Sequence, residues 1–193
     1  MSDKNQLQAY ILCGGKSSRM KSEKGLVNFS GKPFISHIIE ALKPITNNLV
    51  LVTSKKEYEK FGFPLLEDVY KDKGPVGGIF TALNHSQSAG NLILSCDIPL
   101  ITTDVIQKLI GAHTGSSYSI SIATGLNQRH PLIGIYNKTL ESFFENQVLK
   151  DELKLMDVVQ KLAHQTVFID NLEALRNINS KEELDSLSKP EIV

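Results

Sequence analysis

The sequence predicts an α/β protein with a mainly parallel, twisted sheet and helices on both of its faces. Strand-like runs alternate with helical patterns along the chain, and this order is typical of βαβ units. Residues 49–53 and 91–96 are continuous apolar runs, typical of strands buried on both faces. At 193 residues with 41% hydrophobic content, the chain fits one domain, and we expect residues 1–193 to form it.

The composition limits the possible function. The 21 basic and 21 acidic residues give a formal net charge of zero, which disfavours broad nucleic-acid binding. No apolar run approaches the roughly 20 residues of a membrane span, and the polar start MSDKNQLQ does not resemble a secretory signal. We therefore expect a cytoplasmic protein that binds neither nucleic acid nor membrane. Cys13 and Cys96 each end an apolar run, and this favours small buried residues over a zinc site or a redox pair.

Helical and apolar patterns predict the elements of the first half. The residues Phe34, Ile35, Ile38, Ile39 and Leu42 form one apolar helical face, which begins after Pro33 and ends before Pro44. The other expected elements are strands 8–13, 49–53 and 64–66, a short helix 55–61, a glycine-rich turn 71–78 and a helix 78–86.

The second half continues the alternation. We expect strand 91–96, helix 103–113, a strand pair 118–124 and 132–136 joined by a turn at 125–131, helices 138–146 and 153–163, and strand 166–169. Ser180 and Glu183 have the spacing of a capping box, which predicts that the last helix begins at Ser180.

The stretch ILCGGKSSRMKSEKG, residues 11–25, is the strongest functional signal from the residues alone. It leaves the first strand through Gly14 and Gly15 and carries Lys16, Arg19, Lys21 and Lys24 within nine residues. Backbone N–H groups freed by glycine, surrounded by cations, suit a polyphosphate, and Arg19 and Lys24 flank the turn. The spacing matches neither a Walker A motif nor the dinucleotide-binding fingerprint. We interpret the stretch as a loop that holds a nucleoside triphosphate.

Two acidic residues are expected at the same edge of the sheet as this loop. Asp97 directly follows a buried strand, and Asp68 follows strand 64–66. Ligands of open α/β sheets bind beyond the carboxyl ends of the strands. A carboxylate at Asp97 suits Mg²⁺, which prefers hard oxygen ligands shared with water and phosphate. The alternative is an aspartate that only caps the following turn.

Three polar residues of the second half are further candidates. Asn177 and Asn179 lie two apart, so in extended chain both amides face one side, although ordinary loop chemistry would also explain them. His130 is expected in the turn between two strands, where its role, proton transfer or anion contact, stays open.

These residues resemble the molybdenum cofactor guanylyltransferases. LCGGKSSRMKSEKG is similar to the family signature LAGGxSxRMGxDKxL. Further matches follow in order: GKP at 31–33, ED at 67–68, GPVGG at 74–78, CDIP at 96–99, HPL at 130–132 and NINSKEEL at 177–184. The first signature is shared by many nucleotidyltransferases, whereas the later blocks are typical of the guanylyltransferase branch. Together they cover nearly the whole chain.

The resemblance implies a three-layer Rossmann-like nucleotidyltransferase fold and a Mg²⁺-dependent reaction. GTP and the molybdopterin cofactor would give molybdopterin guanine dinucleotide and pyrophosphate. By position, Leu12, Cys13, Gly14 and Gly15 would meet the nucleotide through backbone groups, Lys24 its phosphates, Asp68 its nucleoside and Asp97 the Mg²⁺. Arg19, Lys24 and Asp97 are the expected catalytic residues, and His130, Asn177 and Asn179 would lie on the acceptor side. Other proteins of cofactor biosynthesis or molybdoenzyme maturation are further candidate partners.

The chain departs from the family signature at three positions. Lys21 stands where the family has Gly, Glu23 where it has Asp, and Cys13 where it usually has Ala. Two other functions are therefore kept open. One is a related nucleotidyltransferase that uses CTP or a sugar phosphate, and the other is a non-catalytic nucleotide-binding homologue.

Overall fold

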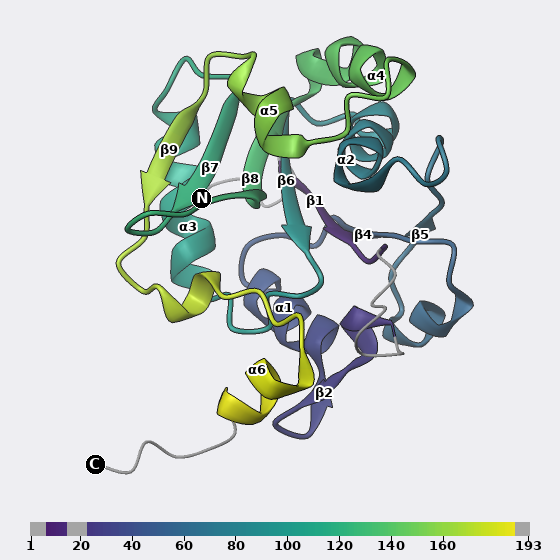
Figure 1. Ribbon diagram of the computed structural model, residues 1–193, viewed down its shortest axis with the longest axis vertical. Coiled ribbons are helices and arrows are strands. Elements are labelled where there is room, and N and C mark those ends of the chain that lie inside the picture. Colours follow the sequence, from purple (N-terminus) through teal and green to yellow (C-terminus); the bar gives the residue numbers. More distant parts are fainter. Residues whose placement is uncertain (1–6, 15–22, 188–193) are drawn as a thin grey trace.

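A seven-stranded sheet forms the centre of the computed structural model, which describes residues 7–14 and 23–187 (Figure 1). The strand order across the sheet is β5-β4-β1-β6-β8-β7-β9. The strands are β1 (Leu7–Leu12), β4 (Leu49–Val52), β5 (Leu65–Leu66), β6 (Gly90–Ser95), β7 (Ile120–Thr124), β8 (Arg129–Asn137) and β9 (Gln165–Phe168). A second, two-stranded sheet is formed by β2 (Asn28–Phe29) and β3 (Lys32–Pro33).

Most strands of the large sheet run in one direction. β1 pairs in parallel with β4 on one side and β6 on the other, and only β8 runs antiparallel to its neighbours β6 and β7. In the register, Leu12 of β1 lies between Val52 of β4 and Ser95 of β6. The carboxyl ends of these three strands therefore meet at one edge. From β1 the chain first adds strands on one side, β4 and β5, and then on the other side, beginning with β6. In an open α/β sheet the ligand crevice is expected at such a switch point, at the carboxyl ends of the strands.

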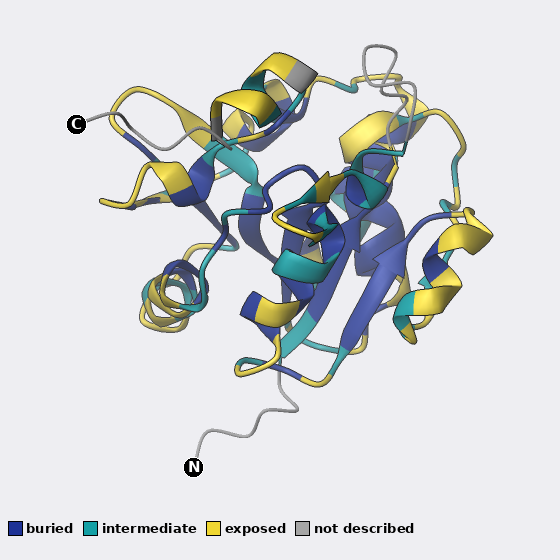
Figure 2. Ribbon diagram, turned by 90° about the horizontal axis from the view of Figure 1, so that it is seen from below, coloured by how far each residue is buried: buried dark blue, intermediate teal, exposed yellow. Residues whose placement is uncertain are grey.

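Helices cover both faces of the sheet and bury its strands (Figure 2). One apolar cluster packs β1, β4 and β6 against α1 (Phe34–Leu42) and α3 (Thr103–Thr114). The other packs the opposite face against α2 (Gly74–His85), α4 (Glu141–Leu149) and α5 (Leu155–Gln160). The apolar residues of β1 alternate between the clusters, because successive strand residues point to opposite faces. The predicted α/β class with a mainly parallel sheet is confirmed.

The prediction of a turn at residues 71–78 followed by a helix at 78 was wrong at its boundary. Gly74 to Gly78 form the first turns of α2, with Pro75 at the start of the helix, where its missing N–H costs nothing. Gly77 and Gly78 allow close packing, whereas Gly74 has a positive φ of 56° that favours glycine. A Cβ on Gly78 would meet Leu12 Cδ1 at 3.1 Å, and one on Gly77 would meet Lys73 Cβ at 2.7 Å.

Other boundaries also differ from the sequence-based expectations. His130 lies in β8 and not in the preceding turn, because β8 extends back to Arg129 and pairs with Thr124 of β7. The predicted short helix 55–61 is the 3-10 helix η2 (Lys56–Phe61). The expected helix 138–146 begins as a 3-10 turn, η3 (Lys138–Leu140), and continues as α4 to Leu149. The helix expected at 153–163 is limited to α5.

The final helix, α6 (Lys181–Leu187), is capped partly as predicted. Ser180 Oγ accepts a hydrogen bond from Glu183 N at 3.1 Å. The Glu183 carboxylate does not return to Ser180, because it accepts from the N–H of Asn179 at 2.6 Å. The remaining elements are the 3-10 helices η1 (Lys24–Leu26) and η4 (Glu173–Leu175). No helix within residues 7–14 and 23–187 is long and apolar enough to cross a membrane.

Candidate active site

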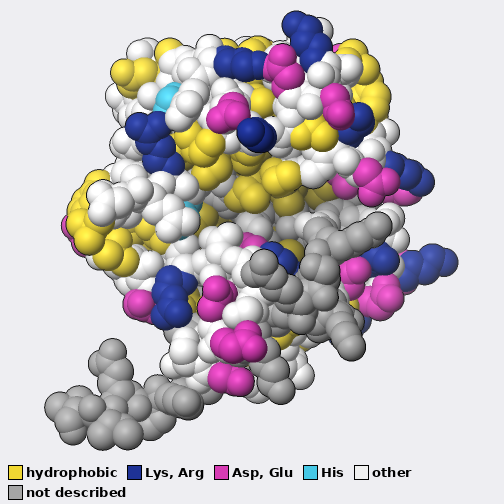
Figure 3. Space-filling view, viewed as in Figure 1, with side chains coloured by type: hydrophobic (Ala, Val, Ile, Leu, Met, Phe, Trp, Pro, Cys, Tyr) yellow, Lys and Arg dark blue, Asp and Glu magenta, His cyan; other side chains and the backbone are white. Residues whose placement is uncertain are grey.

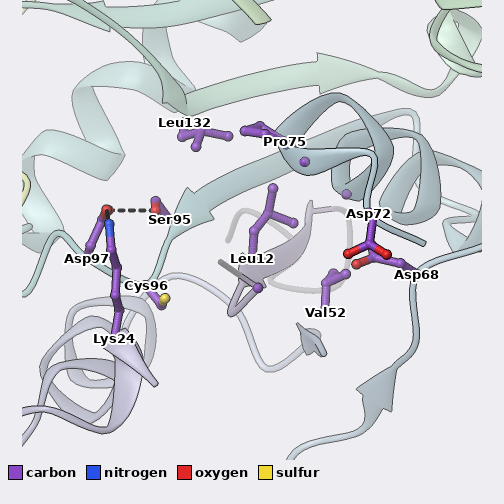
Figure 4. Close-up of a pocket in the computed structure, with 13 residues that line it drawn as sticks. Leu12, Lys24, Val52, Asp68, Asp72, Pro75, Ser95, Cys96, Asp97 and Leu132 are labelled. Carbon is purple, nitrogen blue, oxygen red and sulfur yellow. Dashed lines mark hydrogen bonds and ion pairs between the residues drawn. The ribbon is translucent and has the colours of Figure 1, made fainter. Parts of the chain in front are cut away.

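A cavity of about 500 Å³ opens at the carboxyl edge of β1, β4 and β6 (Figure 4). It is lined by the ends of these strands, by η1 and by the start of α2. In Figure 4, Lys24 and Asp97 lie at one end, Asp68 and Asp72 at the other, and Leu12 between them. The lining residues are Leu12, Gly14, Lys24, Val52, Asp68, Asp72, Gly74, Pro75, Gly78, Ser95, Cys96, Asp97 and Leu132. The cavity therefore has two polar ends and an apolar middle.

The end of β1 brings Leu12 and Gly14 to the cavity. Leu12 O accepts from Cys96 N at 3.2 Å, and Cys13 N donates to Val52 O at 3.0 Å, so these two groups are bonded within the sheet. The chain leaves the sheet after them, and Gly14 lines the cavity. The thiols of Cys13 and Cys96 are both buried, as the sequence predicted, and burial raises the pKa of Cys13 well above its usual value.

Lys24 and Asp97 form an ion pair at one end of the cavity. Lys24 Nζ lies 3.0 Å from Asp97 Oδ2, and the Asp97 side chain is only 8% exposed. Ser95 Oγ donates to the other oxygen, Asp97 Oδ1, at 2.6 Å. The pair joins η1 to the segment after β6, two parts of the chain 73 residues apart. A cation and a carboxylate thus lie side by side where a polyphosphate would need charge compensation.

Asn177 and Asn179 lie against the same ion pair. Asn177 Nδ2 donates to Asp97 Oδ1 at 3.3 Å, and Asn179 Oδ1 accepts from Lys24 Nζ at 2.5 Å. Ile178, between them, is fully buried, and its N–H donates to Asp97 O at 2.8 Å. The backbone is therefore fixed on the strand exit, and the residues on either side of Ile178 both reach the ion pair. The structure brings together four of the predicted site residues: Lys24, Asp97, Asn177 and Asn179.

Asp68 and Asp72 lie together at the opposite end of the cavity (Figure 4). Among the described residues, no hydrogen-bond partner is found for the buried atom Asp68 Oδ1. Burial raises the pKa of Asp68, an effect that the Thr81 hydroxyl partly opposes and Glu67 reinforces. A buried acceptor without a donor is costly, which suits a ligand that donates hydrogen bonds there. Ribose hydroxyls or the amino edge of a base are donors of this kind.

His130 lines a second cavity beside the one at the end of β1. A cavity of about 740 Å³ is lined by His130, Asn177, Asn179 and Arg176, together with residues of the β7–β8 connection. A smaller cavity lined by Ser95, His130, Leu132 and Asn177 lies between the two. Burial lowers the pKa of His130, which keeps its imidazole neutral at neutral pH. The polar residues around Asp97 therefore face two adjoining hollows.

The outer rim of the second cavity is apolar. The exposed side chains of Leu126 and Leu172 line it. In Figure 3, hydrophobic side chains gather at the left edge of the molecule, over the β7–β8 connection and the chain after β9. Together with Gln128 and the asparagines, this rim gives the second cavity an apolar wall and a polar floor.

Several predicted residues lie outside the described part of the chain. These are Gly15, Lys16, Arg19 and Lys21. Glu23 is described, and its carboxylate lies 3.5 Å from Lys55 Nζ. The sequence reasoning missed Ser95 as a lining residue, whereas Asp72 and Pro75 belong to the predicted glycine-rich stretch 71–78. The alternation of β6 would have found Ser95, because it lies two residues before Asp97 and therefore on the same face.

Magnesium, if bound here, would rely on few protein ligands. The described residues contain no group of three or more His, Cys, Asp and Glu side chains that could hold a metal ion. Mg²⁺ commonly uses one or two carboxylates with substrate phosphates and water, and needs no cage of protein ligands. Asp97 Oδ2 and Asn179 Oδ1 are hard oxygen donors that already surround one cation, the Lys24 ammonium. The donor chemistry at this end of the cavity therefore fits the ion.

Comparison with known proteins decides the family. Residues 9–166 match the family model of the MobA-like NTP transferase domain. A relative from Flavobacterium johnsoniae, named "Probable molybdenum cofactor guanylyltransferase", is 50% identical over 184 residues, which cover 94% of this chain and 96% of the relative. The chain belongs to the molybdenum cofactor guanylyltransferase family. It is thereby a nucleotidyltransferase, as the signature in residues 12–25 predicted.

Solved structures agree on the fold of this guanylyltransferase family member. Molybdopterin-guanine dinucleotide biosynthesis protein A from Archaeoglobus fulgidus aligns with a TM-score of 0.80 at 22% identity, covering 93% of this chain and 95% of that one. CMP:2-keto-3-deoxy-manno-octonic acid synthetase, complexed with CTP, aligns with a TM-score of 0.71 at 13% identity, covering 95% and 97%. At such identities the likeness concerns the fold alone, which confirms the nucleotidyltransferase fold and leaves the choice of base to other arguments.

Proposed function

We propose that this protein transfers GMP from GTP to the molybdopterin cofactor, in a Mg²⁺-dependent reaction that releases pyrophosphate. The observation that carries the proposal is the position of Asp97. Its carboxylate lines the cavity that contains Lys24, and Asn177, which donates a hydrogen bond to it, lines a second hollow together with His130 and Asn179. A group transfer needs two substrates on either side of one reacting centre, and this arrangement supplies room for both. The family membership supports guanine nucleotide and molybdopterin as the two substrates.

In the proposed reaction, a terminal phosphate oxygen of the acceptor attacks the α-phosphorus of GTP in line. The bond from the α-phosphorus to the bridging oxygen breaks, and pyrophosphate leaves with the electron pair. The acceptor phosphate is already anionic near neutral pH, so the protein needs no strong base. It must hold two anions together and stabilise the leaving group, which is work for positioning and for cations.

Each site residue has a role in this proposal. Lys24, and Arg19 in the part of the loop outside the described residues, would stabilise the triphosphate and the leaving pyrophosphate. The segment from Leu12 to Gly15 would contact the nucleotide through groups other than Leu12 O and Cys13 N, which are bonded within the sheet, and Asp68 would contact its nucleoside. His130, Asn177 and Asn179 would contact the acceptor. Bound at Asp97, Mg²⁺ would neutralise phosphate charge.

A nucleotide panel tests the proposal. The purified protein is incubated with molybdopterin, Mg²⁺ and each nucleoside triphosphate in turn, and pyrophosphate is measured. Release with GTP alone is expected. Release with CTP would favour a cytidylyltransferase, the alternative with which this chain shares its fold. Tight GTP binding without release in any mixture would favour a non-catalytic homologue. The proposal further implies a cytoplasmic protein, since its substrates are cytoplasmic metabolites, and fractionation of cells checks this.

A further inference from the structure

The two oxygens of the Asp97 carboxylate have different surroundings. Oδ2 faces the cavity and contacts Lys24 Nζ at 3.0 Å. Oδ1 accepts from Ser95 Oγ at 2.6 Å and from Asn177 Nδ2 at 3.3 Å. An O–H···O⁻ bond of 2.6 Å lies in the range of strong, charge-assisted hydrogen bonds, whereas 3.3 Å is long for an amide donor. Ser95 is therefore the main restraint on Oδ1.

Ser95 itself is rigidly held. It is the last residue of β6, and its backbone pairs with Leu12 of β1 in the middle of the sheet. The residue is only 8% exposed, so water competes poorly for its hydroxyl. The hydrogen bond between them places Ser95 and Asp97 on one side, while Cys96 points to the other and joins the apolar cluster under α1 and α3. In Figure 4 the Ser95 side chain points directly at Asp97.

A fixed Oδ1 determines where Oδ2 points. The terminal torsion of aspartate is broad, so a carboxylate without partners samples many orientations. With Oδ1 held by a donor from the rigid strand, Oδ2 is aimed at the cation in the cavity, before any substrate arrives. Hydrogen bonds of this type to metal-binding carboxylates tune both the orientation of the ligand and its affinity for the metal.

We propose that Ser95 is a positioning residue that orients Asp97 for the metal–nucleotide complex. This rests on the proposed function, because it takes the Asp97 carboxylate as the metal ligand. Ser95 lines the cavity, and in the proposal its effect on the metal runs through Asp97. Its removal is expected to weaken the metal site while Asp97, Lys24 and the fold remain.

The direct test measures Mn²⁺ binding to the protein–GTP complex in the absence of acceptor. Electron paramagnetic resonance detects the free Mn²⁺. Ser95→Ala should raise the dissociation constant for Mn²⁺ by about 10- to 100-fold, the usual cost of losing a partner of a metal ligand. Ser95→Thr, which keeps a hydroxyl, should bind Mn²⁺ more tightly than Ser95→Ala. The matched control is Thr103→Val, which removes a hydroxyl that donates to Ala41 O at 2.9 Å, away from the cavity. It should bind Mn²⁺ as the wild type does.

Turnover provides a second readout. In Ser95→Ala the Mg²⁺ concentration for half-maximal rate should rise by a similar factor, and saturating Mg²⁺ should restore much of kcat. Suppose that the wild-type protein–GTP complex binds Mn²⁺ and that Ser95→Ala binds it equally tightly. That result would overturn the role of Ser95 and leave the proposed function standing. If Mn²⁺ binds to the wild-type protein–GTP complex no more tightly than to free GTP, the metal assignment of Asp97 fails, and the role of Ser95 fails with it.

Discussion

The Lys24 ammonium lies 2.5 Å from Asn179 Oδ1, across 155 residues of sequence. The same ammonium lies 3.0 Å from Asp97 Oδ2, so one cation links the η1 turn after β1, the exit of β6 and the segment before α6. None of these segments would form the site alone. Mutations at this centre should therefore affect the nucleotide side and the acceptor side together.

Replacing Lys24 by Ala should weaken GTP binding by about 1.5–3 kcal/mol, which corresponds to about 10- to 150-fold in affinity, because a charge-assisted contact to phosphate is lost. Isothermal titration calorimetry with GTP and Mg²⁺ measures the change. Lys108→Ala is a suitable control, because its partner Asp170 lies on the surface, away from the cavity. Unchanged GTP affinity in Lys24→Ala would reject the phosphate contact.

Replacing Asp97 by Asn should remove Mg²⁺-dependent transfer while the protein stays folded. The amide oxygen can still accept from Ser95, whereas its neutral charge makes it a poor magnesium ligand. Loss of metal charge stabilisation is worth several kcal/mol, so we expect turnover to fall by about 100-fold or more. Circular dichroism checks the fold and pyrophosphate release the activity. A folded variant with wild-type turnover would show that Asp97 is not the metal ligand.

The sequence was sufficient for the fold class and for the edge of the sheet where the cavity opens. Continuous apolar runs with acids directly after them, as at Asp97, carry that information locally. The start of α2 could not be read in this way. Gly77 and Gly78 look like turn residues, and only the close approach of Leu12 and Lys73 in three dimensions explains why glycine is needed inside a helix.

The contacts within the site depended on tertiary structure for the same reason. Spacing indicated that Asn177 and Asn179 share a face, but no local pattern shows that the face meets Lys24 and Asp97. Ser95 is an ordinary strand residue in the sequence, and its role depends on the geometry of a single hydrogen bond. His130 was predicted to lie in a turn, although the residue pairs with Ala123 of β7.

Asp68→Asn should stabilise the free protein at neutral pH while weakening nucleotide binding. Burial raises the pKa of Asp68 in the folded state above its unfolded value, so folding favours the protonated carboxyl. Its contribution to stability is therefore complete below the unfolded pKa of about 3.9 and is lost as pH rises through the folded pKa. Asparagine does not titrate, so the variant should not lose stability in this way as the pH rises.

Urea unfolding of both proteins at pH 7.5 and at pH 4 measures the effect. The variant should gain more stability relative to wild type at pH 7.5 than at pH 4. An equal difference at the two pH values would show that the titration of Asp68 is not responsible. Asp72→Asn, at the same end of the cavity but on an exposed residue, is the control for a change of net charge.

Gly25→Ala tests why the residue after Lys24 lacks a side chain. A Cβ at this position would lie 2.7 Å from Tyr58 Oη, which is closer than real Cβ atoms come, and 3.2 Å from Cys96 Cβ, which is a tight contact. Gly25 and Tyr58 are both buried, so the η1 turn would have to shift and carry Lys24 away from Asp97. Overpacking of this kind costs about 1–3 kcal/mol of stability. GTP affinity should fall as well, because Lys24 moves.

Tyr58→Phe provides the partner for a double-mutant cycle with Gly25→Ala. Among the described residues the buried Tyr58 hydroxyl has no hydrogen bond of standard geometry and only a weak interaction with the Gly25 backbone, so its removal alone should change stability little. In the double variant the nearest atom to the new Cβ is gone, and both stability and GTP affinity should recover in part, since Cys96 Cβ and the Tyr58 ring remain at 3.2 Å. Gly111→Ala in α3, where an added Cβ meets no atom within 4 Å, should be neutral or stabilising. If the effects of the two single changes on stability were strictly additive, the Tyr58 hydroxyl would not be the reason that position 25 needs a glycine.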